Sequence, residues 1–285
     1  MKLFYFLINT NIFIALAAVS LTLETQVQLG MHPQFHPYLF LIFFATLFDY
    51  NFHRLITVIT NKEALNSDKH KWVKQNLLAF YAVVAVSVIG FLWAVVLADK
   101  KVLISLAPIA LVTIFYSFPI FKTNKNIFRL REIPFLKIFL ITLVWSLSTI
   151  LLPIIKSGIT YDKVHIMSML LERFLFVFAI TIPFDIRDLQ ADIKQGLKTI
   201  PAFIGQKRAL MISNFLLLLF TILCLLHYTK APYIWLTAAF LLSSMSTIYF
   251  LNSKKMQSNK FYHYGILDGT LLLQGVLVLI GYYLS

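Results

Sequence analysis

Acidic residues, cysteine and phosphate-binding glycine loops are scarce in this sequence. Twelve Asp and Glu stand against twenty-five Lys and Arg in 285 residues. Cys224 is the only cysteine, which excludes a disulfide within the chain and a metal site built from several thiolates. No Gly-x-Gly-x-x-Gly or Walker-type loop occurs, and the seven histidines include no His-Glu-x-x-His motif. The common dinucleotide-binding, P-loop and zinc-protease classes therefore have no support in the sequence.

Charge of either sign is also sparse, whereas apolar residues are abundant. Charged residues make up 13% of the chain and hydrophobic residues 59%, against about 25% charged residues in an ordinary soluble domain. The net charge of +13 does not indicate nucleic-acid binding, because the basic residues are spread over short loops between apolar runs, as membrane topology requires. The sequence therefore predicts an integral membrane protein whose partner is the lipid bilayer and not a nucleic acid.

Nine apolar runs are long enough to span a bilayer, which takes roughly 20 residues each. No linker or low-complexity tract separates them, so we predict one polytopic domain over residues 1–285, an all-α bundle of about nine transmembrane helices around a central cavity. The predicted spans are 4–26, 36–58, 74–97, 102–118, 133–155, 164–185, 208–228, 231–251 and 262–284.

Basic residues alternate between the loops. Nineteen lie at Lys2 and in the loops after the second, fourth, sixth and eighth spans, and only five lie in the other loops. Because cytoplasmic loops are enriched in Lys and Arg, we expect a cytoplasmic N-terminus and an outside C-terminus. The expected location is a bacterial inner (plasma) membrane, crossed several times.

Three carboxylates, Asp185, Asp188 and Asp192, follow the sixth apolar run directly. On a helix their spacings of three and four place them on one face, within an arc of about 60°. Such a cluster needs a cation, and Mg²⁺ takes oxygen ligands from carboxylates and substrate phosphates. Gly196 and Pro201 are expected to end the helix soon afterwards. The alternative interpretation is a solvated acidic turn at a helix end.

Further polar residues fall at membrane depth, where they are costly and often functional. The end of the second span is polar nearly all round, and it is expected to open to the same side as the Asp185 cluster; an ordinary helix end meeting the headgroups is the alternative. For Glu172 and Arg173 a structural ion pair is as good an explanation as a substrate role. The candidates at the end of the second span and within the ninth are Asp49, Asn51, His53, Arg54 and Asp268.

A basic loop follows the turn Tyr116-Ser-Phe-Pro. Its positive charge suits contact with an anionic headgroup or a diphosphate. The alternative is that the loop is basic only because it is cytoplasmic. The basic residues considered for this contact are Lys122, Arg129, Arg131 and Lys137.

These features together resemble the UbiA superfamily of intramembrane aromatic prenyltransferases, over nearly the whole chain. The family's second motif is Asp-x-x-x-Asp followed by Gly-x-Lys-Ser/Thr, which here reads Asp188 to Asp192 and then Gly196-Leu-Lys198-Thr. The turn at Tyr116 with Lys122 is similar to the loop after the family's fourth helix. The resemblance implies that these residues, assisted by Asp185, hold Mg²⁺ and a prenyl diphosphate, and that a small aromatic or quinone-precursor acceptor is alkylated, as in quinone biosynthesis.

The first motif departs from the family pattern. An Asn-Asp-x-x-Asp-x-x-x-Asp run is typical after the second helix, and here Asn51 matches while Phe52, Leu55 and Ile59 replace the aspartates. Half of the implied metal site is absent, and His53 with Arg54 is a candidate for direct contact with phosphate, which suits the arginine fork. Three interpretations stay open: a Mg²⁺-dependent prenyltransferase, an altered member that binds or carries an isoprenoid lipid, and an ion-coupled transporter.

Overall fold

The structure is a computed structural model that describes residues 2–60, 68–117, 121–123, 126–128, 130–194, 196–228 and 234–284. The side chains of 57–60, 68–70, 121–123, 126–128 and 131 are outside this description. Almost every described residue is helical, as expected where lipid leaves backbone groups no other partner. The elements are α1 Lys2–Asn9, α2 Ile12–Gln28, α3 Pro37–Thr60, α4 Asp68–Gln75, α5 Leu77–Leu97, α6 Lys100–Ser117, β1 Phe121–Thr123, β2 Asn126–Phe128, η2 Leu130–Glu132, α7 Leu136–Ser157, α8 Lys163–Lys194, α9 Ile200–Ile204, α10 Gln206–Tyr228, α11 Ile234–Asn252, α12 Lys254–Gln257, η3 Tyr262–Leu267 and α13 Asp268–Leu284.

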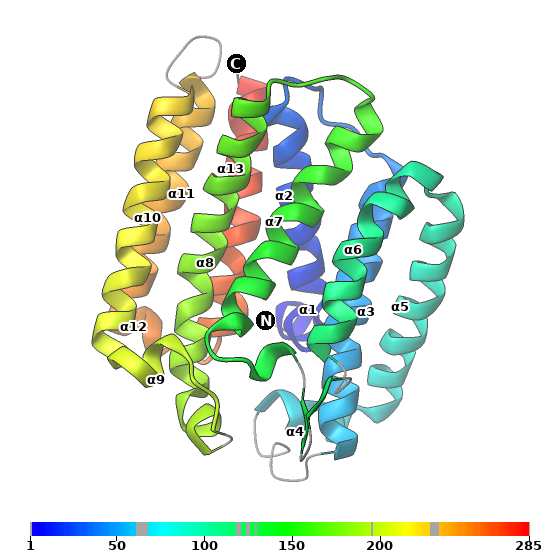
Figure 1. The fold of residues 1–285 in the computed structure, drawn as a ribbon, viewed down its shortest axis with the longest axis vertical. Coiled ribbons are helices and arrows are strands. Elements are labelled where there is room, and N and C mark those ends of the chain that lie inside the picture. Colours follow the sequence, from blue (N-terminus) through cyan, green and yellow to red (C-terminus); the bar gives the residue numbers. More distant parts are fainter. Residues whose placement is uncertain are drawn as a thin grey trace.

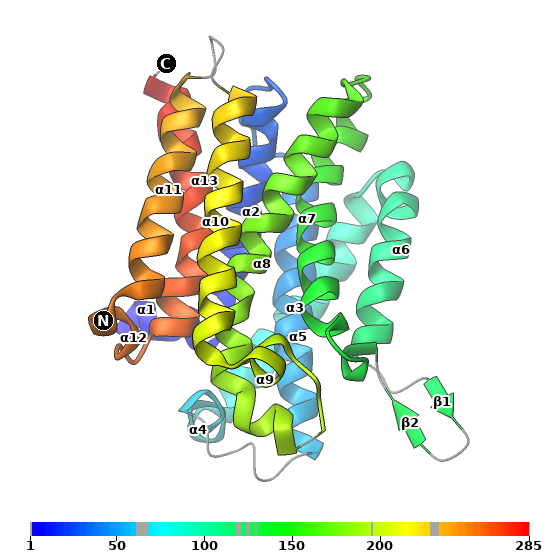
Figure 2. The ribbon, with the colours of Figure 1, turned by 60° about the vertical axis from the view of Figure 1, so that its left-hand side comes forward.

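The long helices run side by side in one bundle, with the N- and C-termini at opposite ends (Figure 1). The short elements α1, α4, α9 and α12 and the antiparallel β1–β2 hairpin all lie toward the end that holds the N-terminus (Figure 2). Large apolar side chains face outward, for example Leu78, which is 86% exposed. A surface of this kind is expected to contact lipid, so the predicted all-α membrane bundle is confirmed.

Eight described helices are long and apolar enough to cross a membrane, and a ninth span results if the bent pair α1–α2 is counted as one. The first predicted span, 4–26, is wrong as a continuous helix, because the chain bends by 79° between α1 and α2. Asn11 stands at the bend with a φ of 62°, in the left-handed region that a helix cannot include. The polar triplet Asn9-Thr10-Asn11 was the sequence signal for this break.

Helix α13 packs closely against α2 at a glycine. A Cβ atom on Gly275 would lie 2.1 Å from Ser20 Oγ and 2.5 Å from the Ser20 carbonyl oxygen. Only glycine permits so close an approach of two backbones, a contact typical of membrane helices. Ser20 also donates a hydrogen bond to the Leu272 carbonyl, 3.1 Å away, so this contact fixes the register of the two helices.

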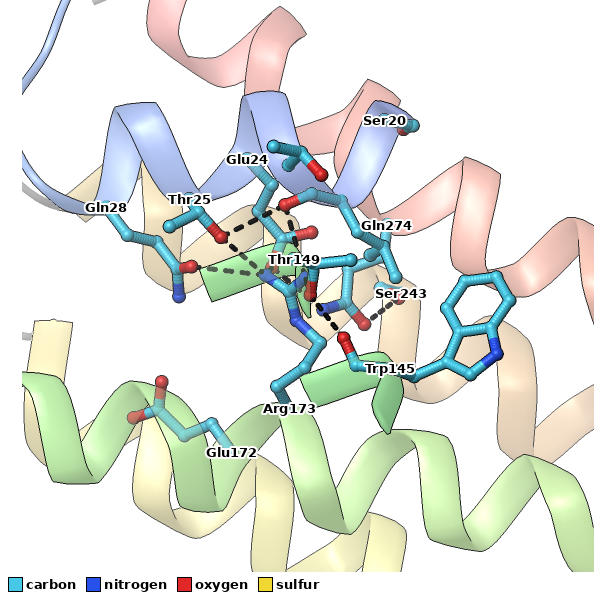
Figure 3. Close-up of polar contacts among 12 residues, drawn as sticks. Ser20, Glu24, Thr25, Gln28, Trp145, Thr149, Glu172, Arg173, Ser243 and Gln274 are labelled. Atoms are coloured by element: carbon cyan, nitrogen blue, oxygen red, sulfur yellow. Dashed lines mark hydrogen bonds and ion pairs between the residues drawn. The ribbon is translucent and has the colours of Figure 1, made fainter. Parts of the chain in front are cut away.

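A network of buried polar side chains ties α2, α7, α8 and α13 together in the bundle interior (Figure 3). Arg173 on α8 forms an ion pair of 2.7 Å with Glu24 on α2, and each side chain is 1% exposed. Its guanidinium also donates to Thr149 Oγ1 and to Gln28 Oε1. Gln274 donates to the same Glu24 oxygen. Since its hydrogen bonds are made inside the chain, Arg173 is a structural residue of the bundle.

Candidate functional site

A polar cavity of about 380 Å³ lies near the N-terminal end of the bundle. Its wall combines charged and aromatic side chains with a few aliphatic ones. It is lined by Asn11, Asp49, Tyr50, His53, Arg54, Val112, Thr113, Tyr116, Leu140, Ile141, Val144, Trp145, Arg187 and Tyr264.

A second cavity of about 440 Å³ adjoins the first and is almost entirely apolar. Helices α3, α5, α6 and α7 supply most of its wall, with Leu41, Phe48, Phe91 and Leu106 among the lining side chains. The two cavities share Asp49, Tyr50, Thr113, Val144 and Trp145. Together they form an amphipathic space with one charged end and one apolar end.

The three predicted carboxylates lie on the last turns of α8, on the one face that their spacing predicts. With 32 residues, α8 is about 48 Å long, longer than the roughly 30 Å hydrocarbon core, so its end is expected to reach the interface. The helix stops as predicted, since Gly196 has a φ of 71° and the Leu197 amide donates back to the Asp192 carbonyl.

Lys137, at the start of α7, lies between two of these carboxylates. Its Nζ is 2.8 Å from Asp185 Oδ1 and 3.4 Å from Asp192 Oδ2. Asp185 and Asp192 are 1% and 6% exposed, so an ammonium group is needed to compensate two carboxylates at such depth. The Lys137 bridge holds the first turn of α7 against the end of α8.

Asp188 is paired with its own neighbour. Arg187 Nε and Nη2 donate to the two Asp188 oxygens at 2.7 and 2.8 Å, which is a bidentate pair. The guanidinium carbon also lies 4.7 Å from the centre of the Tyr264 ring and 5.1 Å from that of Phe184, within the range of cation–π contacts. Arg187 is thereby held at the wall of the polar cavity.

The residues of the first motif fix the bend between α1 and α2. Asn51 donates to the Thr10 carbonyl at 3.0 Å and accepts a hydrogen bond of 3.0 Å from Asn11 Nδ2. Arg54 donates to the Asn9 carbonyl and, at 3.0 Å, to Asn11 Oδ1. Asn51 is fully buried and does not line either cavity. Its predicted place among the substrate-binding residues has no support in this geometry.

Arg54 is also a buried cation in the wall of the polar cavity, and its contacts at the bend do not account for this charge. It is 7% exposed and lines the polar cavity, yet its hydrogen bonds within the described chain go only to neutral oxygen atoms. A buried charge without a counter-ion is costly. The arrangement favours an anion in the cavity.

Asp49 and His53 on α3 lie close to Tyr116 on α6. His53 Nε2 lies 2.7 Å from Ser117 Oγ and 3.6 Å from Asp49 Oδ1, and its ring meets Tyr116 edge to face at 5.9 Å. All three line the polar cavity, and their role in substrate binding stays a prediction.

The remaining predicted residues lie away from the cavities or outside the description. Lys198 is exposed in the α8–α9 connection, where its carbonyl accepts a hydrogen bond from the Phe135 amide. Asp268 begins α13 directly after the π-helical turn η3 and lines neither cavity. The side chains of Lys122 and Arg131 are not among those described.

The sequence profile of the UbiA prenyltransferase family matches residues 73–266, about two thirds of the chain. The chain belongs to this family. Residues 73–266 include α8 and its three aspartates, whereas the altered first motif lies before them. No curated protein matches the chain.

Solved structures of family members have the same fold. A UbiA homologue from Archaeoglobus fulgidus bound to GPP and Mg²⁺ has 16% sequence identity and a TM-score of 0.61, with 96% of this chain and 99% of that chain covered. The homologue from Aeropyrum pernix K1 in its apo form has 15% identity, a TM-score of 0.58 and 96% of each chain covered. A digeranylgeranylglyceryl phosphate synthase has 18% identity and a TM-score of 0.53, with 99% and 97% covered.

The carboxylates of this family member, as arranged here, do not fit a divalent ion. Within the described residues, no three Asp, Glu, His or Cys side chains form a group that could hold a metal. Lys137 occupies the space between Asp185 and Asp192, and both Asp188 oxygens bind Arg187. Of the carboxylate oxygens of these three aspartates, only Asp185 Oδ2 is buried without a hydrogen bond in the described chain. The assignment of Asp185, Asp188 and Asp192 as Mg²⁺ ligands therefore stays a prediction.

Four cavity or motif residues were not predicted as site residues. Arg187 was counted only as a basic residue of a cytoplasmic loop, Lys137 was included only in the basic loop with the charge to cover a diphosphate, and Trp145 and Tyr264 were not singled out. The available signal was the position of Arg187 between Asp185 and Asp188, because a cation inside an acidic motif is a natural partner for it. Nothing local marks Lys137, whose partner Asp192 is 55 residues away.

Proposed function

We propose that this protein binds a prenyl diphosphate in the two adjoining cavities and transfers the prenyl group to a small aromatic or quinone-precursor acceptor. The observation that carries the proposal is the pair of adjoining cavities: a charged cavity lined by the buried cation Arg54 shares five lining residues with an apolar cavity of about 440 Å³. A diphosphate suits the first and an isoprenoid chain the second. Both volumes lie in the range typical of ligand sites.

The chain's own residues supply three contributions to such a transfer. Arg54 and Arg187 face the negative charge that grows on the diphosphate as its carbon–oxygen bond breaks. The rings of Tyr50 and Trp145, at the junction of the cavities, lie where the allylic cation would form and interact favourably with it through their faces. The apolar wall excludes water, which would otherwise capture the cation. The acceptor carbon then forms the new bond and loses its proton.

A second candidate is a family member that binds or carries an isoprenoid lipid without transferring it. The observation in its favour is that all three aspartates of the second motif have partners within the chain, while the first motif lacks its aspartates. The ion-coupled transporter is supported least, because the hydrogen-bonding groups of Arg173 are used within the bundle.

The test is a transfer assay on the full chain in lipid nanodiscs. Labelled prenyl diphosphates of several lengths are offered with hydroxybenzoate, naphthoate and haem acceptors, and binding and product are measured in parallel. We expect binding and product with at least one acceptor. Binding without product from any acceptor supports the carrier, and no binding of any prenyl diphosphate overturns both.

Filling the apolar cavity should shorten the prenyl chain that the protein accepts. Ala45→Phe places a ring in this cavity, so we expect turnover with the longest accepted diphosphate to fall by roughly 10-fold or more, while shorter chains are retained. Ala238→Phe, at an exposed position of α11, is the matched control and should leave the length profile unchanged. If Ala45→Phe left the dependence of turnover on prenyl length unchanged, the prenyl chain would not bind in this cavity.

The orientation predicted from the basic residues is tested by single-cysteine labelling. In a Cys224→Ala background, Ser258→Cys lies between α12 and η3, and Asp162→Cys lies just before α8, at the other end of the bundle; both positions are exposed. Because basic loops stay in the cytoplasm, an impermeant maleimide added outside intact cells should label Asp162→Cys and not Ser258→Cys. The reverse pattern would place the polar cavity toward the outside.

A further inference from the structure

The second motif contains cations at the places where metal chemistry requires free carboxylates. Lys137 bridges Asp185 and Asp192 at 2.8 and 3.4 Å, and Arg187 takes both oxygens of Asp188. A divalent ion would have to displace the half-buried Lys137 ammonium group or break the bidentate pair between Arg187 and Asp188. Either change would cost hydrogen bonds between charged groups, so the resting arrangement competes with metal entry.

Arg187 is built as a fixed anion-binding group. Asp188 fixes two of its nitrogens, and the rings of Tyr264 and Phe184 lie within cation–π distance of the guanidinium. Nη1 donates no hydrogen bond within the described chain, and the side chain lines the polar cavity. A guanidinium held in this way loses little entropy on binding and presents the planar fork that suits phosphate.

Arg54 supplies a second guanidinium to the same cavity. The charged groups that line it are Arg54 and Arg187 against one carboxylate, Asp49, which has His53 beside it. Positive charge therefore exceeds negative charge on the lining itself. The first motif, where the family pattern has aspartates, contributes Arg54 instead, so both halves of the site present arginine.

We infer that Arg187 and Arg54 hold the diphosphate directly, with Asp188 acting as a positioning residue for Arg187, and that diphosphate binding by this protein needs no divalent ion. The inference rests on the proposed function, which it deepens by assigning the groups that contact the diphosphate. In this inference the Asp188 carboxylate orients the Arg187 guanidinium and does not bind a metal.

The experiment measures the affinity of the full chain for a prenyl diphosphate with and without divalent ions. The probe is geranyl diphosphate with sulfur in place of the bridging oxygen, which slows turnover, titrated in nanodiscs in EDTA and in excess Mg²⁺. We expect the two dissociation constants to agree within about threefold. Arg187→Met should weaken binding on the order of 10- to 100-fold in both buffers, because a hydrogen bond to a charged group is lost.

Arg208→Met is the matched control, since Arg208 is exposed on α10 at the same end of the bundle, and it should bind as the wild type does. The comparison of wild-type affinity in EDTA and in Mg²⁺ uses no variant. It therefore tests the inference even if Arg187→Met does not fold. Binding that appears only with Mg²⁺ overturns the inference and leaves the proposed function standing. Failure to bind in either buffer overturns the proposed function as well.

Discussion

Arg173→Met should lower the free energy of unfolding by about 3–5 kcal/mol, the usual cost of breaking a buried ion pair. The variant leaves Glu24 charged in the bundle interior, where it is 0% exposed and its Oε2 already makes no hydrogen bond in the described chain. It also removes donors to Thr149 and Gln28, so contacts between α8 and both α2 and α7 are lost together (Figure 3). The measurement is denaturant unfolding in detergent micelles.

Two further variants show whether the charge itself is responsible. Arg173→Met combined with Glu24→Gln removes both charges and should recover most of the loss, because a neutral pair is often tolerated in place of a buried ion pair. Lys156→Met breaks the exposed pair with Asp99, at 2.5 Å, and should cost less than about 1 kcal/mol. If Arg173→Met behaved like Lys156→Met, the network would be unimportant for stability.

Asp188→Asn should reduce prenyl transfer by about 100-fold or more, close to 3 kcal/mol of transition-state stabilisation. Asparagine keeps the shape of the side chain but cannot accept two hydrogen bonds from Arg187 with full charge. Loss of the guanidinium orientation and loss of a Mg²⁺ ligand both predict this result. The fold should survive, since Asp188 lies at the exposed end of α8 with 37% of its side chain accessible. Asp162→Asn, at the other end of the bundle, is the control.

A double-mutant cycle with Arg187→Met separates the two explanations. If Asp188 acts through Arg187, the double variant should be no slower than Arg187→Met alone, giving an interaction free energy of about 2–3 kcal/mol. If Asp188 instead binds a metal that acts independently of Arg187, the two losses should add. Full turnover in Asp188→Asn would contradict both accounts, and it would remove Asp188 from the site.

The structure gives the first motif a task that the family pattern does not suggest. Asn51 matches the pattern by type, yet its side chain is used to hold the break at Thr10 and Asn11. Arg54 serves the same break while lining the polar cavity. A ligand that attracts Arg54 therefore acts on a residue that also anchors α1, which connects the cavity to the N-terminal end of the chain.

The membrane-spanning helices, apart from the break between α1 and α2, and the face of α8 that carries Asp185, Asp188 and Asp192 can be predicted from the sequence alone. Both follow from local physics: an apolar run must form a helix in lipid to satisfy its backbone, and the helical period fixes which side chains share a face. The position at which α8 ends is also set by the local sequence, because Gly196 adopts a positive φ without strain.

The partners of these charged side chains depend on how the helices pack in three dimensions. Lys137 reaches Asp192 across 55 positions of sequence, and Arg173 reaches Glu24 across 149. A hydropathy profile scores each charged residue separately. It therefore does not reveal that Lys137 lies within the acidic motif or that Arg173 is paired with Glu24 inside the membrane. Such pairings depend on which helices pack together, and helix packing is set by contacts such as Gly275 on Ser20 that involve the whole bundle.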